Sequence, residues 1–161
     1  MLQSPLAQVY FYIIKMQNTM KPITDLFAGA DERNWTKVRS TMAPHVLLDY
    51  TSLAGGSPAT LTPKQITDAW ETVLPGFDRT HHQLFDFRVT ENGDKAHASF
   101  SGKADHFIKA DVWTVEATYD ADLQKTDGNW LVTSLTLHLT RQSGNTNLPA
   151  QAAKNIHKTN P

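Results

Sequence analysis

The chain has 161 residues, of which 40% are hydrophobic and 19% charged, as in a globular protein with one substantial core. Lys and Arg number 15 and Asp and Glu 16, so the formal net charge of −1 gives no electrostatic reason to expect a nucleic-acid or anionic-membrane partner. Cysteine is absent, which excludes disulfides, thiolate metal ligands and a cysteine nucleophile.

The one apolar run near the N-terminus, residues 9–14, is too short to span a bilayer and lacks the pattern of a secretory leader. We therefore expect a cytoplasmic protein. Residues 1–18 are expected to form a helical lead or a loosely attached arm, and residues 19–143 the domain. Residues 144–161 are expected to form a tail that is a short helix or disordered.

A first helix is predicted to begin at Pro22, because proline suits the first turn, where its missing N–H costs nothing. Gly29 would help to end this helix. Its apolar face would carry Ile23, Leu26, Phe27 and Ala30.

Residues 30–52 predict a second helix followed by a strand. Asp31 is a good N-cap residue. A stripe with one-turn spacing follows, at Trp35, Val38 and Met42. Pro44 stops the helix, and residues 45–50 are apolar and β-prone. Such a unit could deliver Asp31 and Tyr50 into one cavity.

Residues 54–59 form a loop by their glycine, serine and proline content, and a third helix follows. Thr62 and Gln65 form a capping box with Pro63 at the first helical position. Helical spacing then continues through Ile66, Ala69, Trp70, Val73 and Leu74.

From Arg79 to about Ser143 the period becomes alternating, which predicts three or four long strands. Asn92-Gly93 predicts a two-residue hairpin turn, and residues 126–128 a three-residue loop with Gly128 left-handed. The longer loop is favoured because it places an apolar face of each strand on the same side. Those faces are Trp113, Val115, Ala117, Tyr119, Ala121 and Leu123, and Leu131, Leu135, Leu137 and Leu139. The fold class is α+β, with the helices gathered on one face of a curved antiparallel sheet.

The sequence contains no phosphate-binding glycine loop, no HExxH and no nucleophile elbow. Ionisable residues near the ends of the predicted elements remain as candidates: Asp31, Asp49, Tyr50, His81, His82, Asp105, His106 and His138. Only the tertiary fold can bring them together, because they are far apart in the chain.

Several short motifs resemble the SnoaL-like branch of the NTF2-like superfamily, and within it the scytalone dehydratases. They are D-x-x-x-W (residues 31–35), A-P-x-x-x-x-D-Y-x-S (43–52), R-T-x-H (79–82), His106, and D-G-x-W (127–130). The resemblance implies a cone-shaped roll, a curved antiparallel sheet with the N-terminal helices packed on its concave face. It also implies an enzyme of the lyase or isomerase type that needs no cofactor or metal.

The chemistry implied is dehydration, isomerisation or aldol-type cyclisation of a small apolar carbonyl or hydroxy compound. The catalytic residues carried over are Asp31, Tyr50, His82 and His106. Asp31 is expected to fix the tautomer of His106, and the phenol of Tyr50 to donate to a developing enolate oxygen. The expected substrate-binding residues are Trp35, Trp70, His81, Phe100, Trp113, Tyr119 and Leu135.

This chain departs from the dehydratase pattern at two positions. Ala30 stands where a tyrosine is expected, and Tyr119 where an asparagine is expected. A two-residue turn at Asn92-Gly93 would put His81 on the same sheet face as His106, whereas the resemblance favours His82. His82 would require a one-residue β-bulge in one of the two strands.

Structural roles remain open for the same residues. Asp31 would serve equally as an N-cap, Tyr50 as a core residue, and the histidines as exposed strand residues. A zinc site formed by His81, His82 and His106 has no supporting spacing. His138, with Trp130, Val132 and Thr136, is expected on an outer sheet face that forms a homodimer. The alternative function is a non-catalytic small-ligand-binding or dimeric interaction module.

Overall fold

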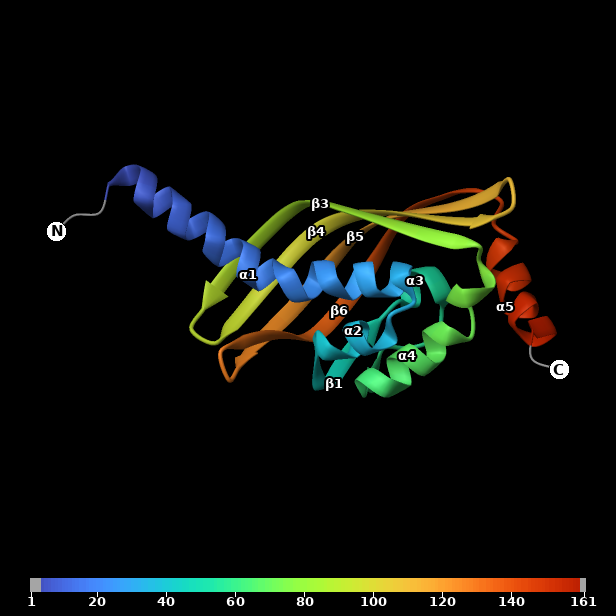
Figure 1. Ribbon diagram of the computed structural model, residues 1–161, viewed down its shortest axis with the longest axis horizontal. Helices are drawn as coiled ribbons and strands as arrows, with labels where there is room; N and C mark the ends of the chain where they lie inside the picture. The colour runs from blue at the N-terminus through green and yellow to red at the C-terminus, as the bar shows by residue number, and fades with distance from the viewer. Residues whose placement is uncertain (1–3, 160–161) are drawn as a thin grey trace.

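The computed structural model describes residues 4–159 and consists of a curved six-stranded sheet with helices along its concave face (Figure 1). The helices are α1 (Pro5–Glu32), α2 (Trp35–Ser40), α3 (Thr51–Ala54), α4 (Pro63–Glu71) and α5 (Leu148–Thr159), with a 3-10 turn η1 (Leu74–Gly76). The strands are β1 (Met42–Asp49), β2 (Ala59–Leu61), β3 (Arg79–Asn92), β4 (Lys95–Ile108), β5 (Asp111–Thr126) and β6 (Asn129–Gly144).

The sheet confirms the predicted α+β class and the meander of long strands. Its order is β2-β1-β6-β5-β4-β3, and every neighbouring pair is antiparallel except β1 and β6, which run parallel. The unclosed, strongly curved sheet leaves a concave face for α1 to cover (Figure 1). This is the cone-shaped, NTF2-like architecture.

The first helix is much longer than predicted. It begins after Ser4, whose side chain accepts a hydrogen bond from the N–H of Ala7, and it runs without a break past Pro22. An interior proline costs roughly 3 kcal/mol. Here burial of Ile23, Leu26 and Phe27 against the sheet offsets that cost.

Asp31 is not an N-cap, which corrects the prediction. It lies in the last turn of α1, and Arg33, with a φ of 57°, ends the helix. Asn34 caps α2 instead, since its side chain accepts a hydrogen bond from the N–H of Lys37. The carboxylate of Asp31 therefore sits at the negative end of a helix dipole, where a negative charge is unfavourable unless other groups stabilise it.

The helix–strand unit around residues 30–52 is present with shifted boundaries. The second helix ends at Ser40 and Met42 already belongs to β1, so the strand begins earlier than predicted. Tyr50 follows the strand and precedes α3. The capping box of Thr62 and Gln65 is confirmed at the start of α4.

The first hairpin has the predicted two-residue turn, one residue later in the chain. Asn92 pairs with Lys95, and the turn residues are Gly93 and Asp94. The predicted three-residue loop of the second hairpin is wrong. Thr126 pairs with Asn129, so the turn consists of Asp127 and Gly128, both with positive φ as a primed turn requires.

A register shift between β5 and β6 places the apolar faces of the two strands on the same side, which the predicted three-residue loop would otherwise have done. Between Leu123 and Asp122 the pairing partner moves from Val132 to Ser134, which adds one residue to β6. Beyond this bulge, the apolar residues of β5 face Leu135, Leu137 and Leu139, as predicted. On the turn side of it, Trp130 and Val132 are buried in the core, which corrects their placement on the outer face.

The C-terminal segment forms α5 and packs on the body of the protein. Leu148 and Ala152 are fully buried beside Phe77 and Trp113. A Cβ added at Gly76 would lie 1.9 Å from the carbonyl oxygen of Ala152, so glycine is required for this close contact. Among residues 4–159, no helix is long and apolar enough to cross a membrane.

Candidate active site

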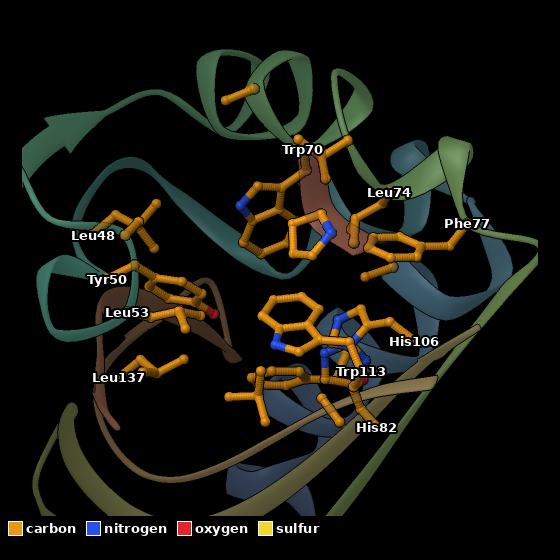
Figure 2. Close-up of a pocket in the computed structure, with 18 of the residues that line it drawn as sticks. Leu48, Tyr50, Leu53, Trp70, Leu74, Phe77, His82, His106, Trp113 and Leu137 are labelled. Carbon is orange, nitrogen blue, oxygen red and sulfur yellow. The ribbon is translucent and has the colours of Figure 1, made fainter. Parts of the chain in front are cut away.

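A cavity of about 320 Å³ lies between the concave face of the sheet, the end of α1 and the segment from α3 to η1 (Figure 2). Its walls are mainly apolar. The lining residues are Phe27, Ala30, Leu48, Tyr50, Leu53, Ala54, Ala69, Trp70, Val73, Leu74, Phe77, His82, Ala104, His106, Trp113, Val115, Tyr119, Leu137 and Pro149.

The structure brings together most of the residues expected at the site. Tyr50, Trp70, His82, His106, Trp113 and Tyr119 line the cavity. Asp31 lies behind His82 and reaches the cavity through it.

Four residues expected to bind substrate do not line this cavity. His81 is exposed on the outer face, because alternate strand residues point to opposite sides. Trp35 packs against the core from α2, Phe100 is buried between Phe87 and Tyr119, and Leu135 is fully buried.

A β-bulge in β3 places His82, rather than His81, on the cavity side. Asp86 and Phe87 lie opposite the single residue Phe100, since Phe85 pairs with Ser101 and Arg88 with Ser99. Asp86 has a φ of 56°, which is typical of a bulge residue. A cavity-facing His82, which the family resemblance favoured over His81, was expected to require such a bulge.

Asp31 and His82 form a hydrogen-bonded pair. His82 Nδ1 lies 2.7 Å from Asp31 Oδ1, and the backbone N–H of His82 donates to Asp31 Oδ2 at 2.8 Å. An ionised carboxylate only accepts hydrogen bonds, so Nδ1 carries a proton, and the lone pair of the unprotonated base is on Nε2. The pair therefore orients a base toward the cavity.

The predicted pairing of Asp31 with His106 is wrong. His106 Nδ1 instead lies 3.1 Å from the backbone carbonyl oxygen of Trp113. A carbonyl can only accept, so His106 also presents an unprotonated Nε2. The two imidazole rings lie edge to face with their centroids 6.0 Å apart (Figure 2).

The surroundings lower the pKa of Asp31 and the pKa of His106. Burial alone would raise the pKa of Asp31, but the hydrogen bonds and charge of His82 and the hydroxyl of Thr80 outweigh it and lower the pKa. Burial lowers the pKa of His106 to about 4, with a further contribution from His82. Asp31 is thus ionised and His106 neutral at neutral pH.

Arg33 and Thr80 extend the pair into a chain of hydrogen bonds that sequence reasoning missed as functional. The Thr80 hydroxyl donates to Asp31 Oδ1 at 2.8 Å and accepts from Arg33 Nη1 at 2.8 Å. The guanidinium also donates to the carbonyl oxygens of Ala30 and Leu74, both at 2.7 Å. Burial lowers the pKa of Arg33 and the charge of Asp31 opposes that shift. These hydrogen bonds hold the carboxylate of Asp31 in place at the C-terminal end of α1, where the helix dipole disfavours a negative charge.

Two tyrosine hydroxyls face the cavity. Burial raises the pKa of Tyr50 and of Tyr119, so both phenols stay protonated. Neither hydroxyl has a hydrogen-bond partner among residues 4–159, and each can donate to a bound molecule. The Tyr50 ring lies 6.3 Å from that of Trp70, across the cavity from the histidines (Figure 2).

Ala30 is buried at the cavity wall, where the dehydratase pattern has a tyrosine. The side chains of His81, His82 and His106 do not converge, because His81 faces outward. In the described part of the chain, no group of three or more His, Asp or Glu side chains is arranged to hold a metal ion.

The sequence missed the apolar lining from Leu53, Leu74 and Phe77, and Pro149 from α5. These residues lie in short turns or in the C-terminal segment, where periodicity carries little information. The signal that could have found Thr80 was the R-T-x-H motif itself.

A family model described as the SnoaL-like domain matches residues 20–136, which include α1 from its middle and almost all of the sheet. The chain belongs to the SnoaL-like family. Asp31, His82, His106 and most of the cavity lie within the matched residues. A search of the curated proteins finds no match.

Solved structures share this SnoaL-like fold at low sequence identity. The protein Kfla4162 from Kribbella flavida has a TM-score of 0.77 at 22% identity, over 86% of this chain and 96% of that one. A candidate scytalone dehydratase from Novosphingobium aromaticivorans has a TM-score of 0.70 at 15% identity, over 83% and 89%. The hexachlorocyclohexane dehydrochlorinase LinA-type3 from Novosphingobium barchaimii has a TM-score of 0.70 at 14% identity, over 84% and 92%.

Proposed function

We propose that this SnoaL-like protein is a cofactor-independent lyase or isomerase that acts on a small apolar hydroxy-carbonyl compound. The observation that carries the proposal is the Asp31–His82 pair, with its 2.7 Å hydrogen bond, at the wall of an apolar cavity. A carboxylate behind an imidazole holds the ring orientation and stabilises the imidazolium that forms when Nε2 takes a proton.

In this mechanism His82 Nε2 removes a proton from the carbon next to the carbonyl. The C–H electron pair moves into an enolate, whose oxygen accepts a hydrogen bond from the Tyr50 hydroxyl. Electrons then return to form the carbon–carbon double bond, and the hydroxyl on the adjacent carbon leaves. It takes the proton from His82 Nε2 and departs as water. Returning the proton to another carbon instead gives isomerisation.

The names of two similar structures, a dehydratase and a dehydrochlorinase, denote eliminations. Both chemistries begin with a positioned base. A leaving hydroxide needs a proton, whereas chloride does not, and the protonated phenols of Tyr50 and Tyr119 add hydrogen-bond donors for an oxygen-containing substrate. These donors support a hydroxy compound rather than a halide.

Proton exchange in D₂O tests the proposal with small model compounds in place of the natural substrate. The protein is incubated with a panel of cyclic hydroxy-ketones and enones, and deuterium uptake and alkene formation are followed by NMR. We expect His82→Gln and Asp31→Asn to lose roughly 10²–10⁴-fold in exchange rate. His81→Gln is the matched control, since its side chain is adjacent in sequence but faces outward.

Equal exchange by wild type and His82→Gln would contradict the proposal. If compounds bind, as seen by chemical-shift changes, but none exchanges a proton, the second functional class applies. The protein would then be a small-ligand-binding module.

A further inference from the structure

Exposed large apolar side chains are concentrated on the first half of α1. Seven of them lie within nine residues and are between 37% and 83% exposed: Leu6, Val9, Tyr10, Phe11, Tyr12, Ile13 and Ile14. Elsewhere among residues 4–159, Leu47 and Phe85 are the large apolar side chains exposed to this degree. Isolated exposed apolar residues are ordinary, but a contiguous group of this size marks an interaction surface.

This part of α1 projects beyond the sheet. Glu91, near the end of β3, holds the helix at the base of this part. Its carboxylate forms an ion pair with Lys15 at 2.8 Å and accepts a hydrogen bond from the Thr19 hydroxyl. The turns before Lys15 continue past the β3–β4 hairpin (Figure 1). We call residues 5–18 the α1 arm.

The apolar spacing of the arm continues the face by which α1 packs on its own sheet. Ile23, Phe27 and Ala30 follow one another at intervals of four and three residues and belong to the core. The same alternation of three and four runs outward through Met20, Met16, Ile13, Val9 and Leu6. Apolar residues at this spacing form a stripe along which two helices pack, and we call this stripe the seam.

We propose that the α1 arm is a self-association surface, on which the arm of a second copy of this chain packs to form a two-fold dimer. A two-fold contact brings a patch against its own copy, so a charged patch would repel itself. Lys15 is the single charged side chain between residues 4 and 20, and it is already paired with Glu91. Two copies of the arm can therefore pack against each other without charge repulsion.

The exposed apolar area of the arm is more than one partner helix can bury. From their exposed fractions, the seven side chains offer roughly 700–800 Å² per copy. Leu6, Val9 and Ile13 lie on the seam, whereas Phe11 and Tyr12 point to other sides of the helix. Because a specific interface of standard size buries about 800 Å² on each partner, contact through the seam alone forms a smaller interface than that.

A lipid surface fits the arm less well. Interfacial helices have a strongly polar, Lys- and Arg-rich face opposite the apolar one. Lys15 is the single basic residue of the arm, and Gln8, Gln17 and Asn18 are its other polar residues apart from the two tyrosines.

The outer sheet face, which is the predicted dimer contact, is polar. His97 contacts Asp122 at 2.8 Å and Asp120 at 3.1 Å, and His138 contacts Asp120 at 2.8 Å. These polar side chains have partners within their own chain. Dimerisation through this face stays a prediction, and it can be distinguished from dimerisation through the arm.

Sedimentation equilibrium of the full-length protein over a wide concentration range tests the proposal. We expect a wild-type species of twice the monomer mass. The variant Val9→Glu/Ile13→Glu puts charge into the seam and should raise the dimer dissociation constant more than about 100-fold. Gln8→Glu is the control, because it puts a negative charge at a polar position instead of the seam and should leave the mass unchanged.

The substituted side chains are exposed, so the monomer should fold as before, and circular dichroism and the unfolding midpoint of the variants verify this. A monomeric wild type would overturn the proposal. So would a dimer that persists in Val9→Glu/Ile13→Glu but is lost in Thr118→Arg on the outer face. Wild-type binding to phosphatidylcholine–phosphatidylglycerol vesicles without self-association would also overturn it.

Discussion

The positive φ of Asp86 sets the direction of the His82 side chain, four residues earlier in the same strand. On the hairpin side of the bulge, Arg88 pairs with Ser99, and the same register continued along β3 would place His81 opposite His106. The extra residue places Thr80 opposite His106 instead, which brings His82 to the cavity side. The bulge therefore selects the histidine that meets Asp31.

Substitutions at Asp86 should separate backbone strain from side-chain contacts. Asp86→Gly should keep or slightly raise the free energy of unfolding, because glycine adopts a positive φ readily. Asp86→Val should lower it by about 1–2 kcal/mol, because a β-branched residue resists this conformation. Urea denaturation measures both. Equal stability of the two variants would contradict a role for the positive φ.

Thr80→Val should weaken the Asp31–His82 pair without changing the volume of the side chain. The variant removes the donor to Asp31 and the acceptor for Arg33, so the pKa of Asp31 should rise and stability should fall by about 1–2 kcal/mol. Proton exchange should fall about tenfold, corresponding to roughly 1.4 kcal/mol.

The control for Thr80→Val is Thr90→Val, an exposed position on the same strand. NMR titration of the Asp31 carboxyl carbon measures the pKa directly. An unchanged pKa with lowered stability would mean that Thr80 has only a packing role.

The buried His106 should make the protein less stable in mild acid. Its pKa in the folded protein is about 4 because of burial, whereas an unfolded histidine titrates near 6.5. Below pH 6.5 the unfolded chain binds a proton that the folded chain does not. The free energy of unfolding is therefore unaffected by His106 above about pH 6.5. It decreases as the pH falls from 6.5 toward 4, by about 3 kcal/mol in total.

Urea denaturation between pH 4 and pH 7.5 tests this, with His106→Asn as the comparison. The variant lacks the ring and should show a smaller decrease over the same interval. Histidine NMR of the folded protein should show His106 still neutral at about pH 5.5. A ring that titrates near 6.5 would contradict the burial effect.

Tyr50→Phe should lower activity while leaving the fold intact. The hydroxyl has no hydrogen-bond partner in residues 4–159, so its removal should change the free energy of unfolding by less than about 0.5 kcal/mol. Loss of a donor to the enolate oxygen should reduce proton exchange about 10²-fold. Undiminished exchange would assign Tyr50 to the cavity wall alone, and the same measurement on Tyr119→Phe would then identify the donor.

Local signals in the sequence were sufficient where one short stretch determines the structure. The capping box at Thr62 and Gln65 fixes the start of α4 through contacts within a single helical turn. Alternation in the long strands predicted the antiparallel meander. The same logic failed at Pro22, because the penalty for an interior proline is local but the compensating burial of Ile23 and Phe27 is not.

The sequence by itself determined the α+β class, the helix-then-meander order and the residue types from which the site is built, because periodicity and capping depend on near neighbours. Only the tertiary structure decided that Asp31 pairs with His82 and that His106 pairs with the carbonyl of Trp113. These partners depend on strand register, and a bulge of one residue reverses the face of every side chain beyond it. A bulge leaves little trace in the alternation of residues, so the pairing could not be read from the chain alone.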